Sequence, residues 1–293
     1  MLAQIVLSTL VGPMVLGGLA YFLGTFRAGA ETGLFAACLL LAVMIAYLTL
    51  EGWPGWPPVS SKQKLPFILA AGAVAFGFWS IAFRKIGTIG VTLLFAVILI
   101  VPLWLIGAHI ATRKPVELAI AVAALVVTLA STMLAHDHAA LPRPIQVAQI
   151  AAAAWALVGL ALVAAFGAFV GMAQVNGAAA AVLGSTVLLA IVASLFASKS
   201  GQAIPPGAVF AVNWLFAAFA GFTALYTPHA SGIAILLLSL CLAVPPVLGL
   251  SRLKVFSRPG IASHLAASIA VGIPAFAPVV WAATAFIVQQ PAQ

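Results

Sequence analysis

Long apolar runs separated by short polar stretches are the dominant pattern along this chain. A transmembrane helix needs about 20 apolar residues, and each run is close to or above that length. The runs cover residues 3–26, 34–50, 65–83, 86–111, 115–135, 147–172, 178–197, 208–226, 232–250 and 261–288. The pattern therefore predicts an all-α integral membrane protein with about ten transmembrane helices.

The connection at 51–64 is the longest polar stretch in the first half of the chain, and it separates the second and third runs. It reads Glu-Gly-Trp-Pro-Gly-Trp-Pro-Pro-Val-Ser-Ser-Lys-Gln-Lys, and its three prolines prevent a helix from continuing through it. Trp53 and Trp56 are side chains of the kind that settle at the headgroup level, and Lys62 and Lys64 indicate water or lipid phosphate. We expect this segment to be an interfacial anchor between two spans.

Later connections are expected at 136–144, at a Gln-Val-Asn-Gly turn covering 174–177, and at 198–206. The fifth run opens with Pro115, and Glu117 follows in its first turn. Proline at the first helical position and an acid in the first turn are typical of a helix start. These signals predict where the fifth span begins.

The composition excludes a soluble protein. Of 293 residues, 65% are hydrophobic and 5% are charged, and the mean hydropathy is +1.25. A soluble domain has roughly a quarter charged residues, so this chain has too few to cover a surface in water. We therefore expect a single transmembrane domain over 1–293, with tentative halves at 1–145 and 146–293, and the lipid bilayer as its main partner.

The twelve basic residues give a net charge of +8, but they stand singly or in small groups between apolar runs. That distribution is typical of topology signals and not of a nucleic-acid-binding face. Connections after odd-numbered spans hold eight of them: Arg27, Arg84, Lys85, Arg143, Lys199, Arg252, Lys254 and Arg258. The positive-inside rule then predicts cytoplasmic odd connections and external termini. We expect a multi-pass protein of a bacterial inner membrane.

Ionisable side chains are nearly absent from the interiors of the runs. The four acidic residues, Glu31, Glu51, Glu117 and Asp137, lie at span ends or in connections. Cys38 and Cys241 are isolated within apolar runs, and the histidines lie near span ends, so we expect no metal, haem or other cofactor. No catalytic motif is present, and we expect the chain not to be an enzyme.

Two parts of the chain show a weak similarity at a constant offset of 147 residues. Leu10-Val11-Gly12, Phe22 and Gly24 recur as Leu157-Val158-Gly159, Phe169 and Gly171. Duplication of a five-span unit would give an inverted 5+5 repeat, as in many secondary transporters. The alternative is chance identity, because Leu, Val, Ala and Gly dominate every run.

Ten spans in about 300 residues, arranged as five plus five, resemble the architecture of the drug/metabolite transporter superfamily. The resemblance covers length and span count only, and it transfers no residue role. Members of that superfamily usually keep both termini in the cytoplasm, which is opposite to the charge distribution here.

Helix interruptions are the strongest functional signal in the sequence, and they are predicted at Gly12-Pro13, Pro245-Pro246, Gly272-Ile273-Pro274 and Pro278. Interrupted helices free backbone polar groups at membrane depth, and transporters use such groups to line substrate sites. Asn213 is the strong side-chain hydrogen-bonding group well inside a span, and Ser185, Thr186 and Thr223 are possible neighbours. The candidate substrate-binding residues are Gly12, Pro13, Asn213, Gly272, Pro274 and Pro278. The alternative is that the prolines only kink their helices and that Asn213 bonds a neighbouring backbone.

The sequence favours a permease for a small neutral or weakly polar solute, since few charges are buried. The alternative is a non-catalytic subunit or scaffold of a larger membrane complex, which the Ala- and Gly-rich helices would also suit. A lipid-modifying intramembrane enzyme would need catalytic groups that the runs lack. Homo-oligomerisation and other membrane-protein partners stay open.

Overall fold

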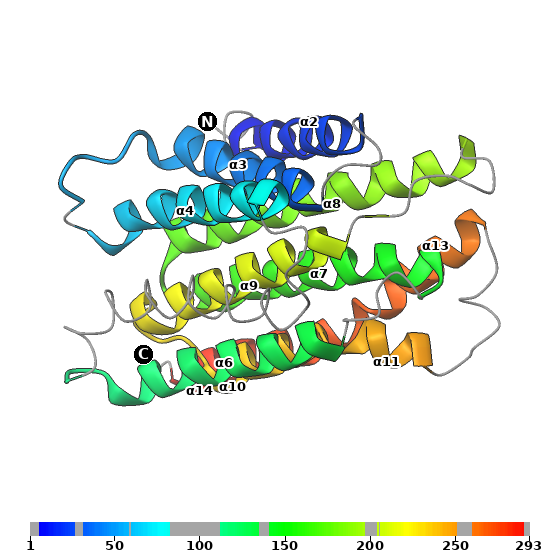
Figure 1. The fold of residues 1–293 in the computed structure, drawn as a ribbon. Helices are drawn as coiled ribbons and strands as arrows, with labels where there is room; N and C mark the ends of the chain where they lie inside the picture. The colour runs from blue at the N-terminus through cyan, green and yellow to red at the C-terminus, as the bar shows by residue number, and fades with distance from the viewer. Residues whose placement is uncertain are drawn as a thin grey trace.

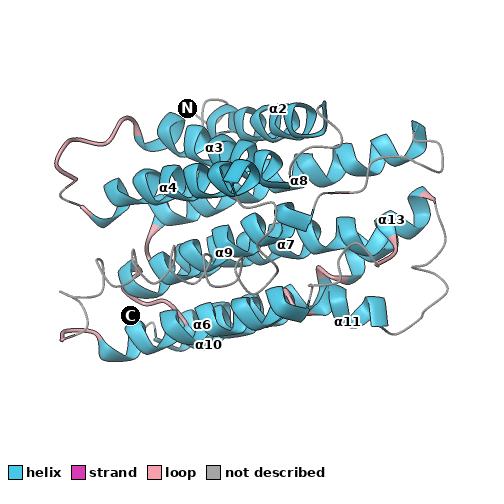
Figure 2. Ribbon diagram, viewed as in Figure 1, coloured by secondary structure: helices cyan, strands magenta, loops and turns pink. Residues whose placement is uncertain are grey.

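The computed structural model describes residues 6–26, 32–58, 60–82, 112–134, 141–196, 204, 206–250 and 260–289. These residues form helices joined by loops, without strands (Figure 2). The predicted fourth span at 86–111 lies outside the described residues. The prediction of an all-helical fold is confirmed for the described residues.

Eleven α-helices and one π-helical turn make up the described part of the chain. They are η1 (Leu7–Val11), α2 (Gly12–Phe26), α3 (Thr32–Glu51), α4 (Ser61–Ala82), α6 (Pro115–Leu134), α7 (Arg143–Phe166), α8 (Val170–Phe196), α9 (Pro206–Tyr226), α10 (Gly232–Cys241), α11 (Val244–Leu250), α13 (Ile261–Ala270) and α14 (Ile273–Gln289). Within the described residues, eight segments are long and apolar enough to cross a membrane. α4 contributes a shorter apolar helix, Gln63–Gly77.

The helices run roughly along one common axis, with α9 in the middle of the bundle (Figure 1). α9 packs against α3, α4, α6, α7 and α10, and its residues 207–225 are all buried. A helix that is apolar on every side is stable only when other apolar elements surround it. α2 and α14 instead present large apolar side chains outward, as lipid-facing helices do.

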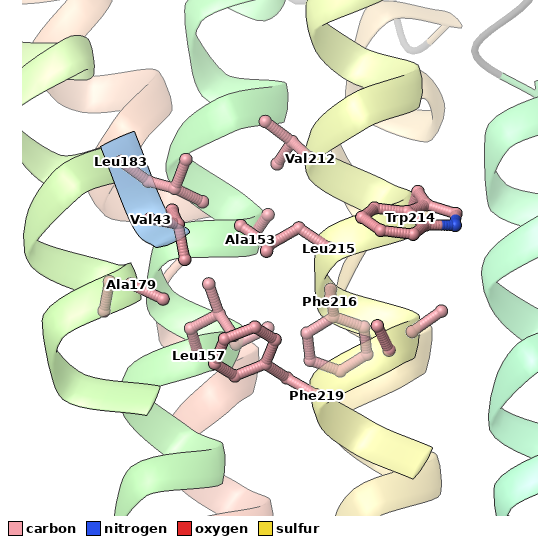
Figure 3. Packing of buried hydrophobic residues seen from close by; sticks show 14 of the residues in the cluster. Val43, Ala153, Leu157, Ala179, Leu183, Val212, Trp214, Leu215, Phe216 and Phe219 are labelled. Atoms are coloured by element: carbon pink, nitrogen blue, oxygen red, sulfur yellow. The ribbon is translucent and has the colours of Figure 1, made fainter. Parts of the chain in front are cut away.

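The centre of the core lies between α9 and α7. Leu215 of α9 approaches Ala153 of α7, and Phe219 lies beside Leu157, whereas Trp214 projects from the other side of α9 (Figure 3). The Trp214 ring lies against α4, where Gly72 leaves room for it. Small residues allow such close helix contacts in membranes, where packing and not water exclusion holds helices together.

The predicted anchor at 51–64 is a connection between helices only in part: its described residues 52–58 and 60 are not helical, whereas 61–64 already belong to α4. α3 ends at Glu51, and Trp53 and Trp56 are 85% and 82% exposed. α4 begins directly after Ser60, ahead of the apolar run, because the Gln63 side chain caps it. The Oε1 atom of Gln63 accepts a hydrogen bond from the Ser60 backbone N–H at 3.2 Å, which is half of a capping box.

The predicted turn at 174–177 is wrong. α8 begins at Val170 and continues through these four residues, and the turn lies earlier, at 167–169. The prediction failed because Asn176 was interpreted as a turn residue. In the folded chain its side chain is buried and bonds another helix, so tertiary packing overrides its local preference for turns.

A Schellman motif forms the true turn after α7. The Phe169 N–H donates to the Ala164 carbonyl at 2.9 Å, and the Ala168 N–H donates to the Ala165 carbonyl at 3.2 Å. Ala168 has a φ of 64°, the left-handed conformation that this motif requires. An alanine in the position usually taken by glycine is the reason why the sequence does not reveal this turn.

Two adjacent spans are broken where the prolines predicted interruptions. α10 and α11 are separated at 242–243, just before Pro245, and α13 and α14 are separated at 271–272, just before Pro274. Pro278 does not interrupt its helix: α14 continues through it. A proline within a helix can be accommodated when neighbouring groups satisfy the freed carbonyl.

The proposed 147-residue offset does not match the helix ends. α2 ends at Phe26, and the same offset leads to Ala173, which lies inside α8 and not at the end of α7. The inverted repeat therefore stays a prediction that depends on the weak sequence identities.

Candidate functional site

Asn213 lies on the central helix α9 and is 3% exposed. Its Nδ2 atom donates a hydrogen bond to Thr132 Oγ1 on α6 at 2.9 Å. The Thr132 hydroxyl in turn donates to the Thr128 carbonyl at 2.7 Å. Asn213 therefore bonds a neighbouring side chain, and an uncharged hydrogen-bonded chain links α9 to α6 in the interior.

Further polar side chains of α6 lie on the same face of the helix as this link. Thr128, Ser131 and Thr132 are all buried, and helical spacing places them on one side of the helix. The Thr128 hydroxyl donates to the Ala124 carbonyl at 2.7 Å, and the Ser131 hydroxyl donates to the Val127 carbonyl at 2.9 Å. These bonds satisfy the hydroxyl donors locally and leave oxygen lone pairs as acceptors.

A second buried polar pair crosses from α9 to α8. Asn176 Nδ2 donates to Thr223 Oγ1 at 3.2 Å, and Asn176 Oδ1 is buried without a hydrogen-bond partner among the described residues. Thr223 lies about 15 Å from Asn213 along α9, because an α-helix rises about 1.5 Å per residue. Sequence reasoning missed this pair, because it placed a turn at 174–177 between two apolar runs.

Ser185 and Thr186, which the sequence suggested as neighbours of Asn213, instead lie at the contact between α8 and α2. The Thr186 hydroxyl is 3.4 Å from the Gly17 carbonyl and 3.0 Å from the Val182 carbonyl. Gly17 has no side chain, which lets α2 approach α8 closely enough for this interaction.

Gly12 and Pro13 lie at the start of α2, after the π-helical turn η1. The Gly12 N–H donates to the Leu7 carbonyl, five residues earlier. Such a wide turn accommodates Pro13, which has no N–H of its own, and π-bulges are frequent at functional sites. This segment packs mainly against α8 and α3.

Gly272 and Pro274 lie at the break between α13 and α14, and Pro278 follows one turn later. α13 and α14 pack against α7, and α14 also packs against α10. The predicted site residues thus fall into three places: Asn213 against α6, Gly12 and Pro13 against α8, and the α13–α14 group against α7. α9, α2 and the α13–α14 pair do not pack closely against one another.

The interior carries little charge. Among the side chains that the structure describes, no Lys, Arg, Asp or Glu is buried. His264 is buried, with its Nδ1 atom 2.8 Å from the Gly260 carbonyl oxygen. The described residues include no group of three His, Cys, Asp or Glu side chains placed to hold a metal ion.

Two cavities stand out in the described part of the structure, and neither is lined by Asn213. One, of about 430 Å³, lies at one end of the bundle beside Phe166, His229, Trp281 and Phe286. The other, of about 340 Å³, is a groove between α7, α8 and α13.

The resemblance to the drug/metabolite transporter superfamily remains one of length and expected span count. Comparison of the chain with protein-family models, curated proteins and solved structures found no match.

Proposed function

We propose that this chain is a permease for a small neutral or weakly polar solute, without a catalytic activity of its own, in a bacterial inner membrane. The observation that carries the proposal is the pair of uncharged polar links on the buried helix α9, Asn213–Thr132 and Asn176–Thr223. Buried polar groups within a span are costly and commonly mark a solute path.

The two broken spans support the same proposal. α10–α11 and α13–α14 are interrupted inside the apolar region, and α10 packs against α14. Discontinuous helices are a recurring way in which transporters present backbone groups to a solute and move between conformations. The absence of buried charge among the described residues favours an uncharged solute.

We also propose the full count of ten spans in two halves of five. α4 and α6 run in the same direction along the bundle (Figure 1). One further span between them, which we assign to 86–111, would return the chain to the side at which α6 begins. With five spans in each half, the second half would have the opposite orientation, as in an inverted repeat.

Flux into liposomes tests the proposal. The purified protein, reconstituted in liposomes, should accelerate entry of uncharged solutes such as glycerol or urea over charged solutes of similar size. Asn213→Ala and Asn176→Ala each remove one of the two polar links, so each should reduce that flux. If Asn213→Ala and Pro274→Ala both leave the flux unchanged, and well above the passive uptake by protein-free liposomes, the proposed site is wrong.

The alternative, a non-catalytic subunit of a membrane complex, predicts a different result. α2 exposes Val15, Leu19 and Phe22, and such a face suits either lipid or a partner helix. Native mass measurement after extraction in lipid nanodiscs would then show a stoichiometric partner, and the isolated chain would give no solute flux.

A further inference from the structure

The groove between α7, α8 and α13 is a second candidate site, separate from the polar links on α9. Its volume is about 340 Å³, and almost all of its lining is apolar. Rim residues such as Leu188, Leu265 and Ile269 are 52%, 45% and 59% exposed. These residues belong to apolar segments long enough to span a membrane, so the groove opens sideways, toward lipid.

One polar side chain interrupts this apolar lining. Ser268 lines the groove and is 9% exposed, and its hydroxyl oxygen is buried without a hydrogen-bond partner among the described residues. Several other buried hydroxyl groups behave differently: those of Thr128, Ser131 and Ser239 each donate to a carbonyl of the preceding turn. The Thr227 hydroxyl also lacks a partner among the described residues, but Thr227 does not line this groove. A buried hydroxyl without a partner has both a donor and an acceptor to offer a ligand.

The groove remains hollow because of Gly184 on α8. A Cβ atom at Gly184 would meet no other atom within 4 Å. Ala151, Ala154 and Ala180 contribute further small side chains to the lining. Side chains of the described residues therefore leave this space open, and a Cβ atom at 184 would extend into it.

The depth of Ser268 limits the chemistry of the ligand. Ser268 lies roughly 10 Å from the start of α13 along the helix, because an α-helix rises about 1.5 Å per residue. At that depth a charged group would be strongly disfavoured, whereas a neutral hydrogen-bonding group is tolerated when it finds a partner.

We propose that this groove binds a neutral lipophilic molecule with a single hydroxyl group, which enters from the bilayer and hydrogen-bonds Ser268. The apolar lining holds the hydrocarbon part, and the Ser268 hydroxyl distinguishes an alcohol from a plain hydrocarbon. Binding at this site does not depend on the transport of a solute past Asn213.

Photolabelling tests the proposal with the full-length protein in liposomes. The probe is a long-chain alcohol with a diazirine in its chain, and the matched probe is the same chain without the hydroxyl. The alcohol should label peptides from α7, α8 and α13, and excess unlabelled alcohol should displace it. Ser268→Ala should lower the preference for alcohol over hydrocarbon by about threefold to tenfold, the equivalent of one hydrogen bond.

Two glycine variants on one helix separate binding from folding. Gly184→Leu fills the groove and should abolish the labelling. Gly177→Leu introduces the same side chain into similarly open space on α8, outside the groove lining, and should leave the labelling unchanged. Unchanged labelling in Gly184→Leu would refute the site.

A third probe, a phospholipid with a diazirine in its acyl chain, identifies the source of the occupant. If this lipid labels the groove as strongly as the alcohol and the alcohol does not displace it, the occupant is bilayer lipid and the proposal fails. Labelling by the alcohol without any solute flux would support the groove and contradict only the permease proposal.

Discussion

The indole Nε1 atom of Trp155 on α7 donates a hydrogen bond to the Ser268 carbonyl on α13 at 3.1 Å. In a continuous α-helix the Gly272 N–H would donate to that carbonyl. Here the Gly272 N–H donates to the Ile269 carbonyl at 2.9 Å, so the Ser268 carbonyl needs another partner. Gly272 also gives the indole room, since a Cβ atom there would lie 2.6 Å from Nε1. One side chain of α7 thus stabilises the break between α13 and α14.

Trp155→Phe should destabilise the protein by about 1–3 kcal/mol, because the buried Ser268 carbonyl loses its partner while the aromatic packing is largely kept. The free energy of unfolding in mixed detergent micelles measures this change. Trp53→Phe is the matched control, since Trp53 is 85% exposed in a loop and should change stability little. Equal effects of the two substitutions would show that the Trp155 hydrogen bond does not hold the break.

Ala168→Gly should stabilise the protein by about 1 kcal/mol. Ala168 has a φ of 64°, a conformation in which the Cβ atom is strained and glycine is not. The same change at Ala161, well inside α7, should cost about 1 kcal/mol, because glycine weakens a helix interior. A thermal unfolding series with both variants checks the opposite signs, and a loss of stability in Ala168→Gly would contradict the Schellman assignment.

The membrane class and most helices could be predicted from the sequence, because lipid as a solvent requires long apolar helices with internally bonded backbones. Pro115 marks the start of α6, and the interruption before Pro274 is present. The end of α7 could not be predicted, since the left-handed residue there is Ala168 and not glycine. Local rules also failed at Asn176, where a hydrogen bond to another helix decided the conformation.

The spatial grouping of the candidate site residues could not be predicted from the sequence, for a different reason. In a run that is apolar on all sides, residue spacing does not show which face meets which neighbour. Thr132, the partner of Asn213, was thus hidden among the apolar residues of its span. The partner of Asn176 was hidden for the same reason, and a turn was predicted in its place.

Gly17→Ala should destabilise the packing of α2 on α8 by about 1–3 kcal/mol, the range for overpacking a tight contact. A Cβ atom at Gly17 would clash with the Val182 carbonyl oxygen, which belongs to the helix backbone. Gly18→Ala is the control, because its Cβ would meet only the Leu189 side chain at 3.4 Å. Unfolding midpoints in detergent should fall for Gly17→Ala alone, and a matching fall for Gly18→Ala would rule out the contact as the cause.

The Asn213–Thr132 hydrogen bond should appear as an energetic coupling between α9 and α6. In a double-mutant cycle with Asn213→Ala and Thr132→Val, we expect a coupling of about 0.6–1.7 kcal/mol, the range measured for hydrogen bonds between membrane helices. Combining Asn213→Ala with Thr223→Val, whose hydroxyl instead accepts a hydrogen bond from Asn176, should give additive effects. If the first cycle is also additive, the 2.9 Å bond does not stabilise the bundle.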